Sequence, residues 1–274
     1  MGPQVTIYEI SWGAAGLLFA LGGARALIHA AKRRGHETGG VGLRLLPVVA
    51  AALALVGARL HALLGAPQAL GAAVVDGTFW LLAATARQRI GGGLLLAGAF
   101  LLWVGPRLGG RRLRGLEILD AIVPVAGLSI AVGRIGCFLG GCCFGVPTEM
   151  PWAVQYGPGS AAYWNHVAQS LIADDGGSSL SVHALSVYLG GAAAAAAIVA
   201  FLAARFVDRP GAATSAFVVC MTSSRLVLEP LRETRFLQTV PAQTELDAGL
   251  LVVALGFACW LSRGRPALSV SPMR

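Results

Sequence analysis

The chain has 274 residues, of which 56% are hydrophobic and only 12% are charged, and its mean hydropathy is +0.70. Soluble domains carry about 25% charged residues, so this composition excludes a soluble globular protein and indicates an integral membrane protein. The formal net charge of +8 does not indicate nucleic-acid binding, because the basic residues lie between apolar runs and form no cluster interleaved with aromatic residues. We therefore expect no nucleic-acid partner.

Seven apolar segments approach the roughly 20 residues that a helix needs to cross the hydrocarbon core of a bilayer. The third is short and rich in glycine, so we expect it to pack closely on its neighbours. The predicted fold class is all-α integral membrane, a single domain of residues 1–274 with about seven transmembrane helices. The segments cover residues 9–31, 44–64, 90–106, 116–133, 183–204, 212–229 and 246–262.

Lysine and arginine concentrate in every second connection between these segments, and cytoplasmic loops collect such residues. This alternation predicts that the N-terminus faces out and the C-terminus faces in. The longest connection, about residues 134–182 between the fourth and fifth segments, then lies on the outer face, where its prolines predict a small lobe. The basic connections contain Lys32, Arg33, Arg34 and Arg44, then Arg107, Arg111, Arg112 and Arg114, then Arg205 and Arg209, with Arg263, Arg265 and Arg274 in the tail.

Four arginines lie within or at the edge of apolar segments: Arg25, Arg59, Arg134 and Arg225. Charged residues inside membrane spans are rare and usually mark a site, although an arginine can also snorkel to the interface or hold helices together in an ion pair. The predicted topology places Arg59, Arg134 and Arg225 in the outer half, whereas Arg25 lies toward the cytoplasmic end and is expected to be structural. Because the guanidinium fork matches phosphate, membrane lipid headgroups are the expected partners.

A second charge cluster closes the sixth segment, where Arg225, Glu229 and Arg232 follow at spacings of four and three residues. These residues share one face if the helix continues through Pro230. The cluster can neutralise itself, or it can contribute to a site.

Three cysteines lie close together in the sequence, at Cys137, Cys142 and Cys143. They can pack as small apolar residues or form a disulfide on the outer face. Alternatively, a thiolate can act as a nucleophile or a metal ligand. No histidine or carboxylate lies beside them at ligand spacing, which favours packing or a disulfide. We therefore expect no metal, and the chain has no nucleotide fingerprint that would indicate another cofactor.

The run GRIGCFLGGCCFG, residues 133–145, resembles the signature of the prolipoprotein diacylglyceryl transferases. Cys137, Gly140 and Cys142 stand where that family has Asn, Asn and Glu. In the third segment, where the family has a His-Gly-Gly, this chain has Arg89-Ile90-Gly91-Gly92-Gly93 and no histidine. The positions that match are Gly133, Arg134, Gly136, Phe138 and Gly145.

Further stretches extend the likeness in the same order along the chain, from Gly57 to Arg235. The segment from Gly57 to Leu60 resembles the family's glycine-arginine-leucine segment, and the segment from Ser181 to Tyr188 keeps the family's His183 and Tyr188. Arg225, Glu229 and Arg232 match the family's late Arg-x-x-x-Glu-x-x-Arg pattern. Asp120 and Pro124 match its acidic residue and proline ahead of the main signature.

The resemblance implies transfer of the diacylglyceryl group of phosphatidylglycerol to the lipobox cysteine thiol of a preprolipoprotein, in the bacterial cytoplasmic membrane, with release of glycerol phosphate. Arg134 and Arg225 would stabilise the phosphate, and His183, or else His61, would accept a proton unless it is only packed. Alternatives are a paralogue that uses another acceptor and a non-catalytic phospholipid-binding or transport protein. Substrate-binding roles are expected for Arg59, Glu229, Arg232, Tyr188 and Gly136.

Overall fold

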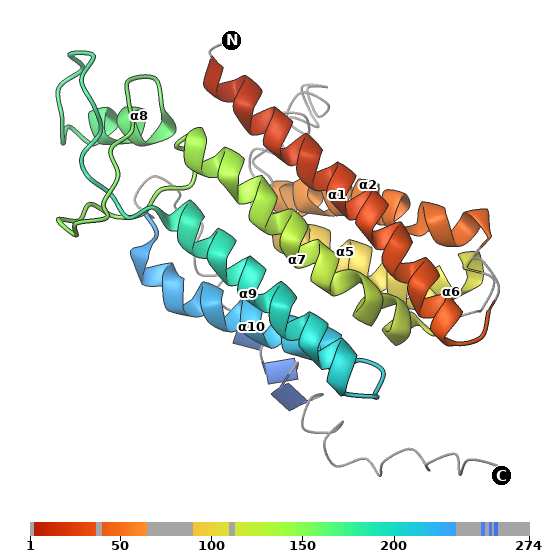
Figure 1. The fold of residues 1–274 in the computed structure, drawn as a ribbon. Helices are drawn as coiled ribbons and strands as arrows, with labels where there is room; N and C mark the ends of the chain where they lie inside the picture. The colour runs from red at the N-terminus through yellow and green to blue at the C-terminus, as the bar shows by residue number, and fades with distance from the viewer. Residues whose placement is uncertain are drawn as a thin grey trace.

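Long helices running back and forth form the body of the protein in the computed structural model (Figure 1). The structure describes residues 3–36, 40–64, 90–109 and 113–233, and near the C-terminus residues 248–249, 252–253 and 255–256. The helices are α1 (Pro3–Arg33), α2 (Val41–Leu64), α5 (Ile90–Trp103), α6 (Gly105–Leu108), α7 (Gly115–Leu139), α8 (Ala161–Ala168), α9 (Leu185–Phe206) and α10 (Ala212–Leu228), followed by the 3-10 helix η1 (Glu229–Leu231).

Four of these helices are long and apolar enough to cross a membrane: Ile7–Arg33, Val41–Leu60, Gly115–Leu139 and Leu185–Phe206. The segment Gly91–Trp103 is apolar but shorter, and α10 has 17 residues. The predicted all-helical membrane class is therefore confirmed, and the first six predicted segments each correspond to a helix. The seventh, 246–262, lies largely outside the described residues.

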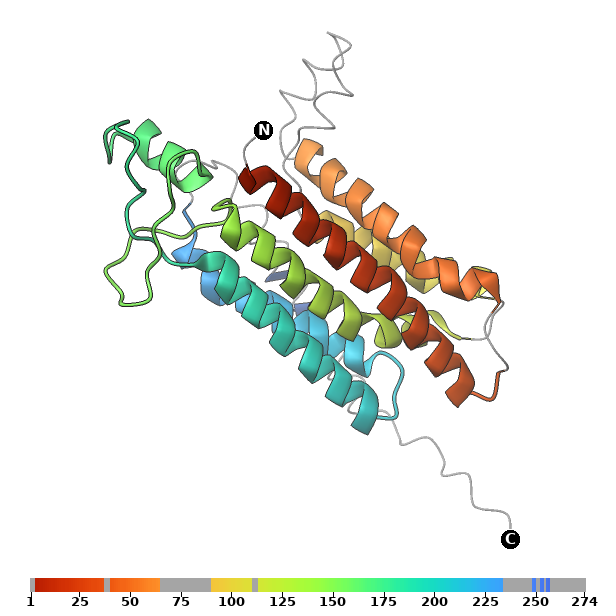
Figure 2. The ribbon, with the colours of Figure 1, turned by 45° about the horizontal axis from the view of Figure 1, so that its top comes forward.

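The helix α7 lies at the centre of the bundle, with α1 on one side and α9 and α10 on the other, while α2 and α5 pack together beyond α1 (Figure 2). The close packing expected of the glycine-rich third segment is confirmed, because a Cβ at Gly93 on α5 would overlap the carbonyl oxygen of Ala54 on α2. Small residues allow helix backbones to approach where no hydrophobic force drives them together.

The expected end of the fourth segment at Gly133 is wrong, since α7 continues to Leu139. Glycine there does not end the helix but lets α1 approach it. A Cβ at Gly133 would lie 2.7 Å from the Trp12 indole, and one at Gly136 would lie 2.6 Å from the Cβ of Ser11. Consequently, Arg134, Gly136 and Cys137 belong to the helix rather than to the connection that follows it.

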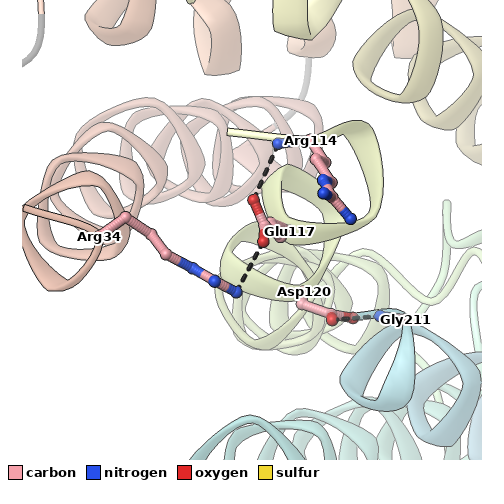
Figure 3. A network of polar contacts seen from close by, with 5 residues as sticks. All are labelled: Arg34, Arg114, Glu117, Asp120 and Gly211. Carbon is pink, nitrogen blue, oxygen red and sulfur yellow. Dashed lines mark hydrogen bonds and ion pairs between the residues drawn. The ribbon is translucent and has the colours of Figure 1, made fainter. Parts of the chain in front are cut away.

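The basic connections lie together at one end of the bundle, where the ends of α1 and α9 meet the starts of α2, α7 and α10. Figure 3 shows part of this end. Arg34 forms a 2.6 Å ion pair with Glu117, whose other carboxylate oxygen accepts a 2.9 Å hydrogen bond from the backbone N–H of Arg114. The acidic side chain thus caps the start of α7 and ties it to the end of α1.

Asp120 serves the start of α10 in the same way. Its carboxylate accepts hydrogen bonds from the backbone N–H of Gly211, and from the backbone N–H and hydroxyl of Thr214 at 2.8 and 2.7 Å. Gly211 has a left-handed backbone with φ of +94°, which glycine adopts without steric cost. The acidic residue that matches the family ahead of the main signature therefore holds α10 against α7.

At the other end of the bundle, the connection between α7 and α9 contains α8 and lies beyond the helix ends (Figure 1). Its core is Tyr156, Ala162 and Val182, with Phe144 packed against them. Val154 and Val182 exchange both backbone hydrogen bonds, at 3.0 and 2.9 Å, in an isolated β-bridge. This segment, residues 140–184, is called the lobe below.

Candidate functional site

Three stretches that are far apart in the sequence meet where the lobe joins the bundle. The backbone N–H of Gly145 donates to the carbonyl of His183 at 2.9 Å, and that of Val146 donates to the carbonyl of Leu231 at 2.9 Å. A Cβ at Gly145 would lie 2.8 Å from the Cβ of His183 and would overlap the carbonyl oxygen of Leu231. Only glycine fits between these two stretches. Gly145 therefore lies between His183 and Arg232, and Arg232 is its β-bridge partner.

Arg134 projects from α7 into this region. Its aliphatic stem passes Gly190 on α9, where a Cβ would lie 3.2 Å from that of Arg134. One terminal nitrogen, Nη1, donates to the sulfur of Cys143 at 3.6 Å, while Nε is buried and has no hydrogen-bond partner among the described residues. A buried N–H without an acceptor is costly, and the oxygens of a bound anion would satisfy it.

Arg232 lies in the same region, since it pairs with Gly145, two residues after Cys143. It forms a 3.1 Å ion pair with Glu229, and both side chains are largely buried, at 23% and 17% exposure. The pKa of the Cys143 thiol is well below its usual range, first because neighbouring thiols hydrogen bond to it and then because Arg134 and Arg232 are close. Arg134 on α7 therefore contacts this sulfur, and Arg232, in the extended chain after η1, adds its positive charge nearby.

The predicted geometry of the late charge cluster is wrong in one respect. The α-helix does not continue through Pro230 but ends at Leu228, and Glu229–Leu231 form the 3-10 turn η1. Arg232 itself is extended, with φ of −80° and ψ of 135°. The tighter turn is followed by the extended residue Arg232, which pairs with Gly145.

The three cysteines gather at the end of α7. The sulfur atoms of Cys137, Cys142 and Cys143 all lie within 4.8 Å of one another, and none of these thiols forms a disulfide. Beside them, the hydroxyl of Tyr156 is buried without a hydrogen-bond partner in the described part of the chain. Burial, and then the nearby thiols, raise the pKa of Tyr156 to about 12, so this phenol stays protonated.

His183 and Tyr188, the two residues kept from the family's histidine segment, contact each other. The histidine Nδ1 lies 3.4 Å from the tyrosine hydroxyl, and the rings meet edge to face at 6.0 Å. Ser186, on the first turn of α9, donates from its hydroxyl to the carbonyl of Cys143 at 2.7 Å. The start of α9 is thereby tied to the cysteine that Arg134 contacts.

The remaining predicted residues are placed differently. Arg225 is half-buried in the last turn of α10, and Gly136 packs against α1. Arg59 is exposed on α2, which packs on α1 and α5 (Figure 2), and no contact with the cysteines is found for it among the described residues. The side chain of His61 and all of Arg89 lie outside the described residues.

The sequence profile of the family described as prolipoprotein diacylglyceryl transferase matches residues 4–262 of the chain. The chain belongs to this family. The resemblance drawn from the sequence motifs is therefore confirmed, and the region around Arg134 is the family's signature segment.

Curated members of the family carry the name phosphatidylglycerol–prolipoprotein diacylglyceryl transferase. The one from Cupriavidus pinatubonensis is 29% identical over 177 residues, which cover 62% of this chain and 54% of the relative. The Clostridium tetani member is 51% identical over 41 residues, or 15% of this chain and 16% of the relative, and the Leifsonia xyli member is 36% identical over 70 residues, or 26% and 20%. Even the longer of these matches spans only about half the length of the relative.

Sequence reasoning identified the transferase signature but missed several groups that the fold brings to it. Tyr156, Ser186 and Gly190 carry no motif, and their roles depend on how the lobe and α9 meet α7. The three cysteines that follow Arg134 in the sequence indicated a contact such as the one between Arg134 and Cys143. Their spacing alone did not show what the thiols do.

Proposed function

We propose that this protein transfers the diacylglyceryl group of phosphatidylglycerol to the lipobox cysteine thiol of a preprolipoprotein and releases glycerol phosphate. Membership of the transferase family supports the activity, and the names of its relatives support both substrates. The observation that carries the proposal is Arg134, which reaches Cys143 at the lobe end of an apolar bundle with a buried N–H available for an acceptor, close to the stretch where Arg232 pairs with Gly145.

The reaction breaks one carbon–oxygen bond and forms one carbon–sulfur bond. The acceptor sulfur attacks the diacylglyceryl carbon that bears the phosphate, and the electron pair of the broken bond leaves on the phosphate oxygen of glycerol phosphate. Negative charge therefore grows on the phosphate as the bond breaks. Guanidinium groups held in place beforehand, in a site poor in water, stabilise such charge more strongly than water does.

Each predicted site residue receives a role in this reaction. Arg134 and Arg225 bind the phosphate in the transition state, joined by Arg232, which Glu229 orients through their 3.1 Å ion pair. His183, in contact with Tyr188, accepts the proton of the acceptor thiol. Arg59 steers the headgroup from α2, and the family match at Gly136 is explained by the close approach of α1 to the site.

The proposed orientation puts the lobe and the site outside the bacterial cytoplasmic membrane, with the N-terminus out and the C-terminus in. The described arginines and lysines of the basic connections gather at the end of the bundle opposite the lobe, which supports this orientation through the positive-inside rule. A site on the outer face can meet the signal peptide of a preprolipoprotein after it emerges from the membrane.

Replacement of the family's Asn, Asn and Glu by Cys137, Gly140 and Cys142 favours a second candidate, in which the same lipid group goes to another acceptor. A non-catalytic lipid-binding protein is the third outcome of the test below.

The deciding experiment is rescue of bacteria depleted of their own transferase, read as the mass of a diacylglyceryl group on the lipobox peptide of a reporter lipoprotein. Purified protein in phosphatidylglycerol vesicles is then tested for release of glycerol phosphate with and without a lipobox peptide. Modification of the peptide supports the proposal. Release of glycerol phosphate without peptide modification points to another acceptor, and lipid binding without release overturns an enzymatic role. Arg205→Ala, an exposed arginine at the opposite end of the bundle, is the matched control for Arg134→Ala.

A further inference from the structure

We infer that Cys137, Cys142 and Cys143 form a binding site for a thiophilic d10 cation, for which Zn²⁺ is the probe. The site lies at the end of α7, beside the arginines that bind the phosphate in the role proposed above, and its three ligands take no part in that role. Its three sulfur atoms lie within 4.8 Å of one another. Thiolates are the preferred ligands of such cations.

The spacing of the sulfur atoms matches a metal site better than a disulfide. The sulfurs of Cys142 and Cys143 are 3.9 Å apart. A tetrahedral ion with metal–sulfur bonds of about 2.3 Å holds its sulfurs roughly 3.8 Å apart, whereas a disulfide needs about 2.05 Å. The cluster therefore needs only small side-chain movements to close around an ion.

The backbone holds the three cysteines in this arrangement. The chain turns back at Gly141, whose φ is +60°, and the backbone N–H of Cys142 then donates to the carbonyl of Cys137 at 3.2 Å. The ring of Tyr156 lies where a side chain at Gly141 would be, 2.9 Å from the position of its Cβ. The carbonyl of Cys143 is held by Ser186. A preformed site spares the ion the entropic cost of gathering its ligands.

The surroundings suit a tri-thiolate complex in charge and in hydrogen bonding. Three thiolates around a divalent ion leave one net negative charge. Arg134 donates to the sulfur of Cys143 at 3.6 Å, and Arg232 pairs with Gly145, two residues further along the chain. Guanidinium N–H groups can donate to the ligating sulfurs and offset this negative charge. The buried hydroxyl of Tyr156, which has no partner among the described residues, can hydrogen bond to a water that completes the tetrahedron.

The test uses the full chain in detergent, reduced and handled without oxygen. Zinc is titrated against a competing chromophoric chelator, and Cd²⁺ is used to detect thiolate-to-metal charge-transfer absorption. Wild-type protein and Cys220→Ser, which removes a thiol from α10, are expected to bind one ion with that absorption. Cys142→Ser and Cys143→Ser are expected to bind more than about 100-fold more weakly, beyond the loss caused by removing an outer partner.

A second measurement on the wild-type protein covers the case in which a variant does not fold. Bound Zn²⁺ should slow alkylation of the three clustered cysteines, as read peptide by peptide in a mass spectrometer, and should leave Cys220 unaffected. Equal zinc affinity in wild type and Cys142→Ser, or alkylation rates that zinc does not change, would overturn the inference. Neither measurement depends on transferase activity, so its result is independent of the proposed reaction.

Discussion

Arg134→Ala tests the phosphate-binding role most directly. The wild-type guanidinium is half-buried, donates one hydrogen bond to the sulfur of Cys143 at 3.6 Å and leaves Nε without a described partner. A unit charge about 4 Å from a phosphate oxygen contributes about 4 kcal/mol at an effective dielectric constant of about 20. Removing a single preorganised donor typically lowers kcat by about 10²–10³-fold, and we expect a loss in this range.

The same contacts predict a small effect on folding. Because Arg134 makes one weak hydrogen bond to a thiol, its removal should change the free energy of unfolding by no more than about 1 kcal/mol. Arg134→Lys keeps the charge but loses the planar fork, so its kcat should lie between those of the wild type and Arg134→Ala. This ordering separates a role in phosphate binding from a role in packing alone.

The assay is single-turnover modification of a lipobox peptide by purified protein in phosphatidylglycerol vesicles, with the thermal unfolding midpoint measured on the same samples. Arg205→Ala is the control, since its side chain is exposed and stacks on Phe206 at 5.8 Å, away from the lobe. A folded Arg134→Ala protein that retains more than about a tenth of the wild-type kcat would refute the reasoning.

Three further substitutions test how the site is held together. Gly145→Ala places a methyl group against the carbonyl of Leu231 and should destabilise the protein by about 1–3 kcal/mol with loss of transfer, whereas an unchanged unfolding midpoint would show that the three stretches are not held tightly. Asp120→Asn should lower the free energy of unfolding by about 1–3 kcal/mol, because it weakens charged hydrogen bonds to α10, and should lower the unfolding midpoint. An unchanged midpoint would show that these hydrogen bonds do not stabilise the fold. Burial lowers the pKa of His166 from its usual 6.5. As the pH falls below about 6.5, the unfolded lobe binds a proton at this histidine before the folded lobe does, so the lobe should lose stability. His166→Asn, which can still accept from the N–H of Leu180, should abolish that dependence in limited proteolysis of the lobe, and an equal pH slope in both proteins would contradict it.

The sequence predicted the bundle well because its apolar runs are long and separated by charged connections. Three predicted segments agree with helices to within a few residues. They are 44–64 with Val41–Leu64, 183–204 with Leu185–Phe206, and 212–229 with Ala212–Leu228. The end of α7 was missed for a physical reason. Glycine often ends helices in soluble proteins. Here, Gly133 and Gly136 lie inside α7 and let α1 pack closely against it.

The site could be predicted only in part, because it depends on turns rather than on helical periodicity. The importance of Arg134 followed from a charge at the edge of an apolar segment. Its contact with Cys143 depends on the left-handed turn at Gly141, and the approach of Arg232 depends on the change from α-helix to 3-10 turn at Glu229. No spacing rule in the sequence determines either change of direction.

The contact between Trp12 and Gly133 bears on how the protein is made. Because α1 precedes α7 in the chain, the surface at Gly133 on which Trp12 packs exists only after α7 has been synthesised. Arg232 completes the site later still. The site therefore cannot form until synthesis has passed Arg232, and a chain interrupted before α10 would lack it.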